Sequence, residues 1–459
     1  MFGGLTNMKF GQRYSIRNNL KPVEIARGIW NPHMRLWRDI IEDYLYISKK
    51  RINNKLSIFK LQLNILQDLI NNTNTIDDYK KLEEKLTKDE QQGIISKKEF
   101  EHEKEHINSE ILSTNIINKA LREIADGMVW KYFNYNRAIL YMLADKQPIE
   151  TIRLDQGALN TLYEFSDVFS NPEAIAIYND ITNFLRVGDI TQIKEDGSIE
   201  IIEVKASKKR DKRVTRQKQR MSELVEFFNT GLTNYDGKQM KIIDSNIRQK
   251  TYLSMLLDGI HKARYQGYES VLIGNYLILE IVDFSKIDDS SDFIGYFESK
   301  HKSVKEEWEK RNPRVFSTFF TDKMDYSKNC APFSIYPFDI ETCTDIMMGT
   351  LTIRASFNFS ELLQIIKKAG WDIKDALMLR SKAEIDALRG KDTRDISFLK
   401  VNKGPFTIDV PPSLIARMQY ELLSPATLIA ELEESLKMGS QKEVDYHLIN
   451  YTDEKSIWK

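Results

Sequence analysis

Apolar residues recur at three- and four-residue steps in the first third of the chain, which is the spacing of an amphipathic helix. Between residues 34 and 130 the clearest series is Ile58, Leu61, Ile65, Leu66 and Leu69. A polar run at 71–74 interrupts it, and residues 75–111 continue with dense Glu and Lys and few apolar positions. The pattern predicts a long, partly exposed helical hairpin, with a coiled coil as one form of it.

The pattern changes near residue 151, where short runs rich in Ile, Val and Leu alternate with helical stretches. The predicted elements are a helix at 155–169, strands at 184–194 and 198–206, helices at 214–228 and 247–265, and strands within 270–284. Asn171-Pro172-Glu173 has the cap residue, proline and acid of a further helix start. Helices before, between and after strands indicate a sheet flanked by helices.

A polar stretch at 288–292 precedes a last region with short strands, such as 351–356, and helices, such as 360–369 and 412–423. A chain of 459 residues is expected to form two or three domains. The sequence predicts a helical domain at 1–150 that contains the charged hairpin, an α/β domain at 151–290, and a C-terminal α+β accessory domain at 291–459.

The composition limits the partners and the cellular compartment that the sequence predicts. Lys+Arg and Asp+Glu both total 67, so any attraction to nucleic acid must come from local patches. The two cysteines lack the spacing of a structural zinc site, which favours a reduced, cytoplasmic compartment. No apolar stretch approaches the ~20 residues of a membrane span, so we expect a soluble protein that does not enter a membrane.

The most informative motif is a predicted β-hairpin with Glu195-Asp196-Gly197 as its three-residue loop. In that register Lys194 pairs with Ser198, and Asp189 lies opposite Glu203 on the face that also carries Lys205. A two-residue turn would shift the register by one and move Asp189 to the other face.

These residue types suit metal-dependent hydrolysis. Two carboxylates on neighbouring strands, roughly 5 Å apart, are the oxygen ligands that Mg²⁺ prefers, with Mn²⁺ as a substitute. We therefore expect Asp189 and Glu203 to hold the metal and Lys205 to orient the nucleophile or stabilise the charged phosphate. The alternative is that all three are ordinary edge-strand charges.

A basic cluster follows at once. Residues 205–220 contain nine basic residues and one acid, Asp211. Such a stripe is expected to contact a phosphate backbone, although a solvated helix face is the alternative. The candidates for nucleic-acid contact are Lys208, Lys209, Arg210, Lys212, Arg213, Arg216 and Gln217.

Gly188-Asp189, the spacer of 13 residues and Glu203-Val204-Lys205 resemble the PD-(D/E)XK nuclease superfamily, with Gly188 where its members usually have proline. The resemblance covers about 155–284. It implies a mixed central sheet flanked by helices in the order α-β-β-β-α-β, and magnesium-dependent cleavage of DNA. Some members add an acid from the first helix, for which Glu164 and Glu173 are the candidates.

Further expectations follow from these features. The helical region is expected to form a homo-oligomer or to sense a partner, and the whole resembles prokaryotic phage-defence nucleases. The alternatives are a nuclease that acts on RNA, and a non-catalytic nucleic-acid-binding or scaffold protein. Within the helical region, Arg122 and Asp126 have the i,i+4 spacing of a mutual ion pair, and His102 and His106 are expected to be an exposed pair.

Overall fold

The computed structural model describes residues 32–144, 152–204, 212–235, 238–287, 304, 306–308, 315–326, 330–376, 399–439 and 446–458. Contacts between these residues divide the chain into two compact units. Of the described residues, the first unit contains those within 242–331 and 350–459, and the second contains those within 32–241 and 332–349. Both units combine helices with small sheets, so the prediction of a mixed α/β protein with a helical N-terminal region is confirmed.

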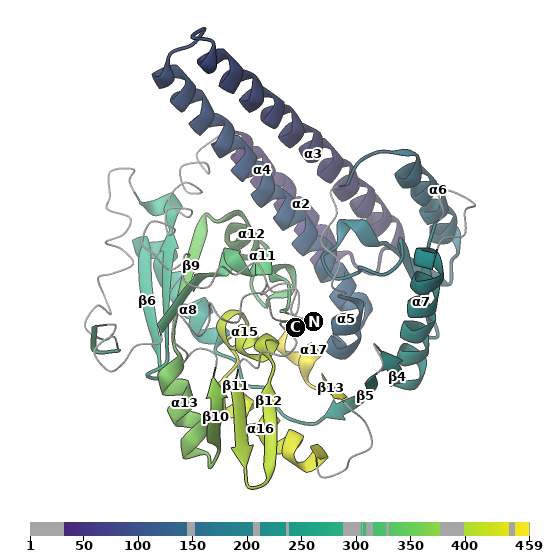
Figure 1. Cartoon of the computed structure of the whole chain (residues 1–459), viewed down its shortest axis with the longest axis vertical. Helices are drawn as coiled ribbons and strands as arrows, with labels where there is room; N and C mark the ends of the chain where they lie inside the picture. Colours follow the sequence, from purple (N-terminus) through teal and green to yellow (C-terminus); the bar gives the residue numbers. More distant parts are fainter. Residues whose placement is uncertain are drawn as a thin grey trace. The chain divides into compact units, whose positions relative to one another are not determined.

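The second unit contains a long helical arm, formed by α3 (Lys55–Gln91) and α4 (Lys97–Tyr132) (Figure 1). Helix α2 (Pro32–Lys50) packs against both of them. The apolar positions predicted for the helical face are all buried, namely Ile58, Leu61, Ile65, Leu66 and Leu69. None of the residues from 74 to 106, all of which are described, is buried. The prediction of a long, partly exposed hairpin is confirmed, and His102 and His106 are exposed on it.

The polar run at 71–74 interrupts the apolar series but not the helix, because α3 continues to Gln91. Thr73 Oγ1 donates a hydrogen bond to Leu69 O, 2.8 Å away, and Asn72 Nδ2 donates to Asn118 Oδ1 of α4, also at 2.8 Å. Polar side chains break a helix when they compete for its backbone groups. Here they bind the preceding turn and the neighbouring helix, so the backbone hydrogen bonds of α3 continue.

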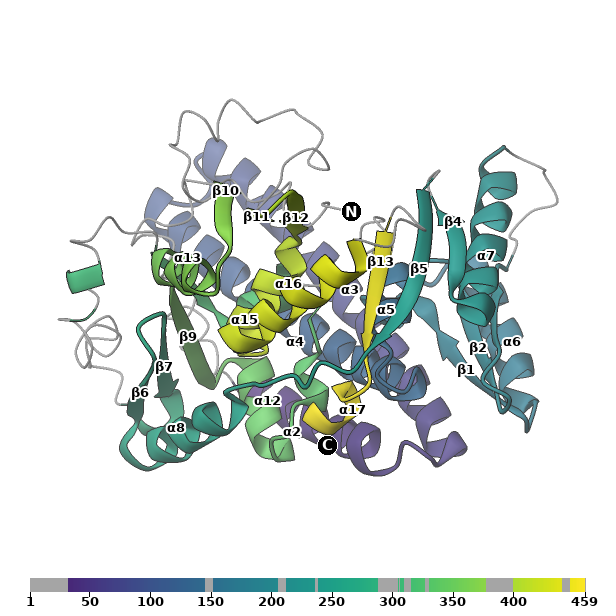
Figure 2. The same ribbon diagram turned by 90° about the horizontal axis from the view of Figure 1, so that it is seen from below.

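The α/β part of the second unit follows the arm. Its elements are α5 (Arg137–Leu143), α6 (Gln156–Ser170), β1 (Ala174–Tyr178), η2 (Asn179–Ile181), β2 (Ile190–Lys194), β3 (Ile199–Ile202), α7 (Lys212–Thr230), β4 (Leu232–Tyr235) and the first part of β5 (Lys238–Ser245), whose residues 242–245 belong to the first unit. Strands β1, β2 and β3 form an antiparallel sheet in that order. Helix α6 packs on β1 and β2, and α7 packs on β3 and β4 (Figure 2). From α6 to β4 the order is α-β-β-β-α-β, but β4 pairs with β5 and belongs to a different described sheet from β3.

Two local predictions in this part are wrong. Asn171 does not start a helix: it ends α6, and its Oδ1 accepts a hydrogen bond from the N–H of Glu173 at 3.0 Å. Asparagine before proline favours a turn as readily as a helix cap, and the apolar run that follows forms β1. The predicted strand at 184–194 is also too long, because β2 begins at Ile190 and the residues before it form a loop.

A segment distant in sequence completes the second unit. η5 (Phe333–Ile335) and α12 (Ile340–Met348) pack against α2 and α4. Arg38 of α2 binds Asp345 of α12, with 2.9 Å between Nε and Oδ1. The N–H of Phe333 donates to Glu123 Oε2 of α4 at 2.6 Å. Polar contacts of this kind fix the segment on the helices.

The first unit is built on small antiparallel sheets, one with strand order β6-β7-β9-β8 and one with order β10-β11-β12. Its strands are β6 (Tyr268–Ile273), β7 (Leu277–Asp283), β8 (Val315–Phe319), β9 (Leu351–Asn358), β10 (Asp372–Ala376), β11 (Leu399–Lys403), β12 (Phe406–Val410) and β13 (Tyr446–Tyr451). Its helices are α8 (Leu253–Gln266), η3 (Phe284–Lys286), η4 (Phe320–Asp322), α11 (Lys323–Tyr326), α13 (Phe359–Lys368), α15 (Pro412–Tyr420), α16 (Pro425–Gly439) and α17 (Glu454–Ile457). β7 is buried along its whole length, as its apolar run predicts. No helix in the described ranges is long and apolar enough to cross a membrane.

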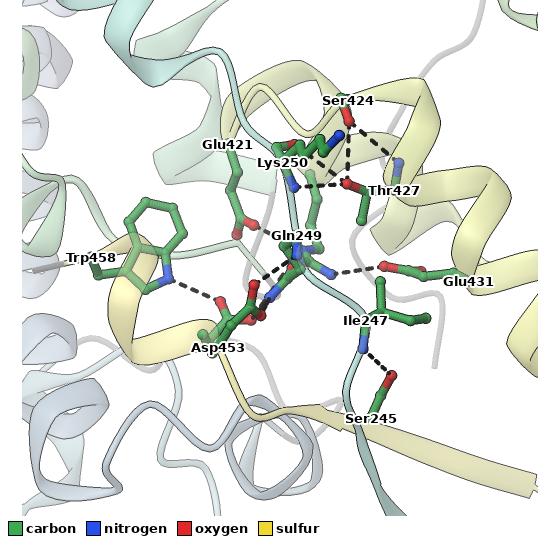
Figure 3. Close-up of polar contacts among 12 residues, drawn as sticks. Ser245, Ile247, Gln249, Lys250, Glu421, Ser424, Thr427, Glu431, Asp453 and Trp458 are labelled. Carbon is green, nitrogen blue, oxygen red and sulfur yellow. Dashed lines mark hydrogen bonds and ion pairs between the residues drawn. The ribbon is translucent and has the colours of Figure 1, made fainter.

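A buried polar network, of which Figure 3 labels Gln249, Glu421 and Glu431, includes Arg417 of α15, which is 4% exposed. Its guanidinium forms ion pairs with three buried carboxylates, those of Glu421 at 2.8 Å, Glu431 at 3.6 Å and Glu454 at 3.8 Å. Gln249 joins the network by donating to Glu454 Oε2 at 2.9 Å. The network connects α15, α16 and α17 with the segment that precedes α8.

Candidate functional site

The predicted β-hairpin has the predicted register. Strands β2 and β3 pair with Ile190 opposite Ile202. At the loop, the N–H of Lys194 donates to Ser198 O at 2.9 Å, and Gly197 adopts a φ of +81°. A three-residue loop with a left-handed glycine is what the register requires. The predicted register, on which the candidate site depends, is therefore confirmed from the loop back to Ile190, the first residue of β2.

Asp189 lies one residue before β2, where the regular ladder ends. Its N–H donates to Ile202 O at 2.8 Å, and its Oδ2 accepts a hydrogen bond from the N–H of Val204 at 2.6 Å. The carboxylate therefore reaches the main chain immediately after Glu203, and does so through a local irregularity in the pairing. Both acids are partly buried. The structure thus brings Asp189 and Glu203 to the same end of the hairpin.

Gly188 permits this irregularity. Its φ is +70°, a conformation that costs side-chain-bearing residues about 1–2 kcal/mol. A Cβ atom on Gly188 would also lie 2.4 Å from Ile201 Cγ2 and 3.0 Å from Ile202 O. Proline, with φ fixed near −65°, does not fit here. The departure from the proline of the resembled superfamily therefore has a local conformational reason.

Asn179, which sequence reasoning did not single out, binds the chain on both sides of Asp189. It is fully buried at the start of η2. Its Nδ2 donates to Val187 O and Gly188 O, both at 3.0 Å, and its Oδ1 accepts from Thr191 Oγ1 at 2.9 Å. Its main-chain N–H donates to Asp189 O at 2.9 Å. An asparagine after an alternating apolar run is a general turn signal, so the sequence does not distinguish this residue.

Arg122 and Asp126 of α4 bind the same loop. The side chains of both residues form hydrogen bonds with that loop, although their i,i+4 spacing predicts that they pair with each other. Arg122 Nη1 donates to the carbonyl oxygens of Asp180 and Thr182. Asp126 accepts from the N–H and the Nδ2 of Asn183, both at 2.7 Å. Burial is the main reason why the pKa of Asp126 rises to about 7.

Other members of the predicted site are placed only in part. The residues outside the described ranges are Lys205, Lys208, Lys209 and Arg210. Lys212, Arg213, Arg216 and Gln217 belong to α7, where the backbone is described and these side chains are not. Leu224 and Phe227 are buried on the same helix.

The acids proposed to extend the site from the first helix do not join it. Glu164 is exposed on α6. Glu173 is exposed beside the hairpin loop, where its carbonyl oxygen accepts from the N–H of Glu195 at 3.0 Å. A strand rises about 3.3 Å per residue, and the five residues of β1 separate this end from the Asp189 end. Glu173 therefore lies at the opposite end of the sheet from Asp189.

The chemistry of Asp189 and Glu203 fits a hard divalent cation such as Mg²⁺, which prefers carboxylate oxygens and keeps several waters. No group of three or more His, Cys, Asp or Glu side chains within the described ranges is arranged to hold a metal. A cavity of about 460 Å³ is lined by Lys50, Arg51, Asn53 and Asn54 of the α2–α3 turn, rather than by the hairpin.

Comparison with known proteins gave no match, whether to a family model, a curated protein or a solved structure. The functional argument therefore depends on the residues of this chain.

Proposed function

We propose that the chain is a metal-dependent nuclease of the PD-(D/E)XK type that hydrolyses phosphodiester bonds of DNA, in prokaryotic defence or DNA processing. The observation that carries the proposal is the hairpin. Its register, and the hydrogen bond from Val204 to Asp189, bring Asp189 and Glu203, the acid that begins the acid-x-lysine motif, to one end of two neighbouring strands. The order α-β-β-β-α-β from α6 to β4 supports it.

The residues have distinct roles in this proposal. Asp189 and Glu203 would hold Mg²⁺, or Mn²⁺ in its place. A bound divalent metal lowers the pKa of its water and offsets the charge that builds up on the phosphate. Lys205 orients the attacking water or stabilises the negative phosphate oxygens. The basic residues between 208 and 217 hold the nucleic-acid backbone, so binding is expected to weaken steeply with salt.

The test is a substrate panel of plasmid, linear duplex, single-stranded DNA and RNA, each with Mg²⁺ or Mn²⁺. We expect wild-type cleavage of DNA, and a loss of at least about 100-fold in Asp189→Asn, Glu203→Gln and Lys205→Ala with nucleic-acid binding retained. Glu200→Gln is the matched control, because Glu200 lies on β3 but is exposed and paired with Lys194 at 3.2 Å. Its activity should equal that of the wild type.

The outcomes separate the alternatives. Cleavage of RNA alone, lost in the same variants, would make the protein a ribonuclease with the same site. Binding without cleavage of any substrate, unchanged by Glu203→Gln, would contradict the proposal and favour a non-catalytic nucleic-acid-binding protein. Equal loss of cleavage in Glu200→Gln and Glu203→Gln would show that general damage to the hairpin, rather than loss of a metal ligand, explains the effect.

A further inference from the structure

The loop between β1 and β2 connects the helical arm to Asp189. Apart from the short η2, it has no regular structure between Tyr178 and Ile190. Buried backbone groups in such a loop need side-chain or water partners, because no strand or helix supplies them. The partners include Asn179 within the loop and two residues of helix α4 of the arm.

Asn179 fixes the end of the loop that carries Asp189. Four of its hydrogen bonds reach Val187, Gly188 and Thr191 through the side chain, and Asp189 through the main chain. Because the residue is fully buried, water does not compete for these bonds. The backbone on either side of the Asp189 carboxylate is therefore held by one amide.

Helix α4 fixes the other end of the loop. Arg122 binds two loop carbonyls, and Asp126 binds the N–H groups of Asn183 and Phe184 at 2.7 and 3.3 Å. Both α4 residues are buried, at 7% and 1% exposure. Burying charged groups is costly unless they are paired and hydrogen-bonded. Because two buried charged side chains, those of Arg122 and Asp126, bind this one loop, we expect the fold to depend on the position of the loop.

The second helix of the arm binds the strand that leads into the loop. Gln62 of α3 is 1% exposed. Its Nε2 donates to Ala176 O at 3.0 Å, and its Oε1 accepts from the N–H of Tyr178 at 2.9 Å. The amide thus satisfies the outer edge of β1 as another strand would. Both helices of the arm are therefore hydrogen-bonded to the backbone that ends at Asp189.

We infer that Asn179 and Asp126 are positioning residues for Asp189, so that the base of the helical arm sets the geometry of the candidate metal-binding carboxylate. The inference rests on the proposed nuclease function and adds a role for the arm in it. A group that orients a metal ligand through hydrogen bonds changes metal affinity when it is removed, commonly by 10- to 100-fold. A residue that only stabilises the fold changes the unfolding midpoint and leaves metal affinity as it was.

The experiment uses the full chain and compares Asn179→Ala and Asp126→Asn with wild type. The dissociation constant for Mn²⁺ is measured by titration calorimetry, and the Mg²⁺ concentration for half-maximal cleavage is measured on a labelled duplex. We expect both quantities to rise by roughly 10-fold or more in each variant. Asp126→Asn keeps the size of the side chain, so it remains informative if Asn179→Ala does not fold.

Asn72→Ala is the matched control, because Asn72 is also a buried asparagine, 5% exposed, but binds Asn118 within the arm. It should lower the unfolding midpoint without changing the Mg²⁺ requirement. Folded Asn179 and Asp126 variants with wild-type metal dependence would overturn the inference and leave the nuclease proposal standing, as would an equal shift in Asn72→Ala. A wild-type protein that neither binds Mn²⁺ nor cleaves any substrate would overturn both.

Discussion

Replacing Gly188 with alanine tests whether the irregular backbone at Asp189 is required by the fold. Gly188 and Gly197 both have positive φ, +70° and +81°, at opposite ends of the same hairpin. They differ in their surroundings. A Cβ on Gly188 would meet Ile201 Cγ2 at 2.4 Å and the carbonyl oxygen of Ile202 at 3.0 Å, whereas one on Gly197 would meet nothing within 4 Å.

The magnitude follows from the comparison of the two sites. Left-handed backbone costs alanine about 1–2 kcal/mol at either position, and the lower entropy of the unfolded alanine chain offsets about 0.4–1 kcal/mol in both. These contributions cancel in the difference. What remains at Gly188 is the steric overlap with β3, and overpacking of this kind costs about 1–3 kcal/mol. We therefore expect Gly188→Ala to be less stable than Gly197→Ala by about 1–3 kcal/mol.

The assay is urea denaturation of wild type and both variants, followed by far-ultraviolet circular dichroism. Nuclease activity of the folded variants is measured in parallel. Because relief of the overlap moves residue 188 away from β3, the Gly188 variant should also lose cleavage, while the Gly197 variant should keep it. Equal unfolding midpoints for the two variants would refute the steric reasoning. Full activity in a destabilised Gly188 variant would show that catalysis does not need this backbone geometry.

Two further predictions concern buried charge. Burial, and then the nearby lysines at positions 49 and 50, lower the pKa of Lys131 to about 8. Above that pH the unfolded chain holds one more proton than the folded one, so the free energy of unfolding should rise by up to about 2 kcal/mol between pH 8 and about 9.5. Urea denaturation at several pH values should show a smaller rise in Lys131→Met. The same dependence of the free energy of unfolding on pH in the variant and the wild type would contradict the prediction. Arg417→Met leaves three carboxylates buried without their cation and should cost about 3–5 kcal/mol. The half-exposed ion pair of Lys403 is the control, because Lys403→Met should cost at most about 1 kcal/mol in the same denaturation experiment, and a similar cost for both would contradict the reasoning.

The sequence predicts the hairpin well because short-range rules determine it. A loop of Glu195-Asp196-Gly197 between alternating apolar residues specifies both the turn and the register. The buried face of the arm is equally local, since the apolar series from Ile58 to Leu69 has helical spacing. Each of these predictions depends on residues within a few positions of one another, and each is confirmed.

Prediction from the sequence is least reliable where the same residue types occur in two kinds of local structure. Asn171 has the features of a helix cap but ends α6, and the polar run beginning at Asn71 has the features of a loop but continues α3. The division into units also depends on long-range contacts. Residues 332–349 belong to the same unit as α2, α3 and α4 through pairs such as Arg38 and Asp345, whereas the sequence suggests consecutive domains.

The base of the arm shows why the candidate site could be predicted only in part. The acid and the acid-x-lysine motif are visible in the sequence, but two of the residues that bind the loop before Asp189, Arg122 and Asp126, lie on a helix about sixty positions earlier. A mutual i,i+4 ion pair would account for both Arg122 and Asp126, so the sequence gives no reason to expect another partner for either residue. Yet Arg122 and Asp126 bind buried backbone groups of the loop before Asp189, and an apolar residue at position 126 would leave the N–H of Asn183 without its side-chain acceptor. Arg122 and Asp126, two of the charged positions in an otherwise apolar stretch of α4, are thus explained by the loop that they bind.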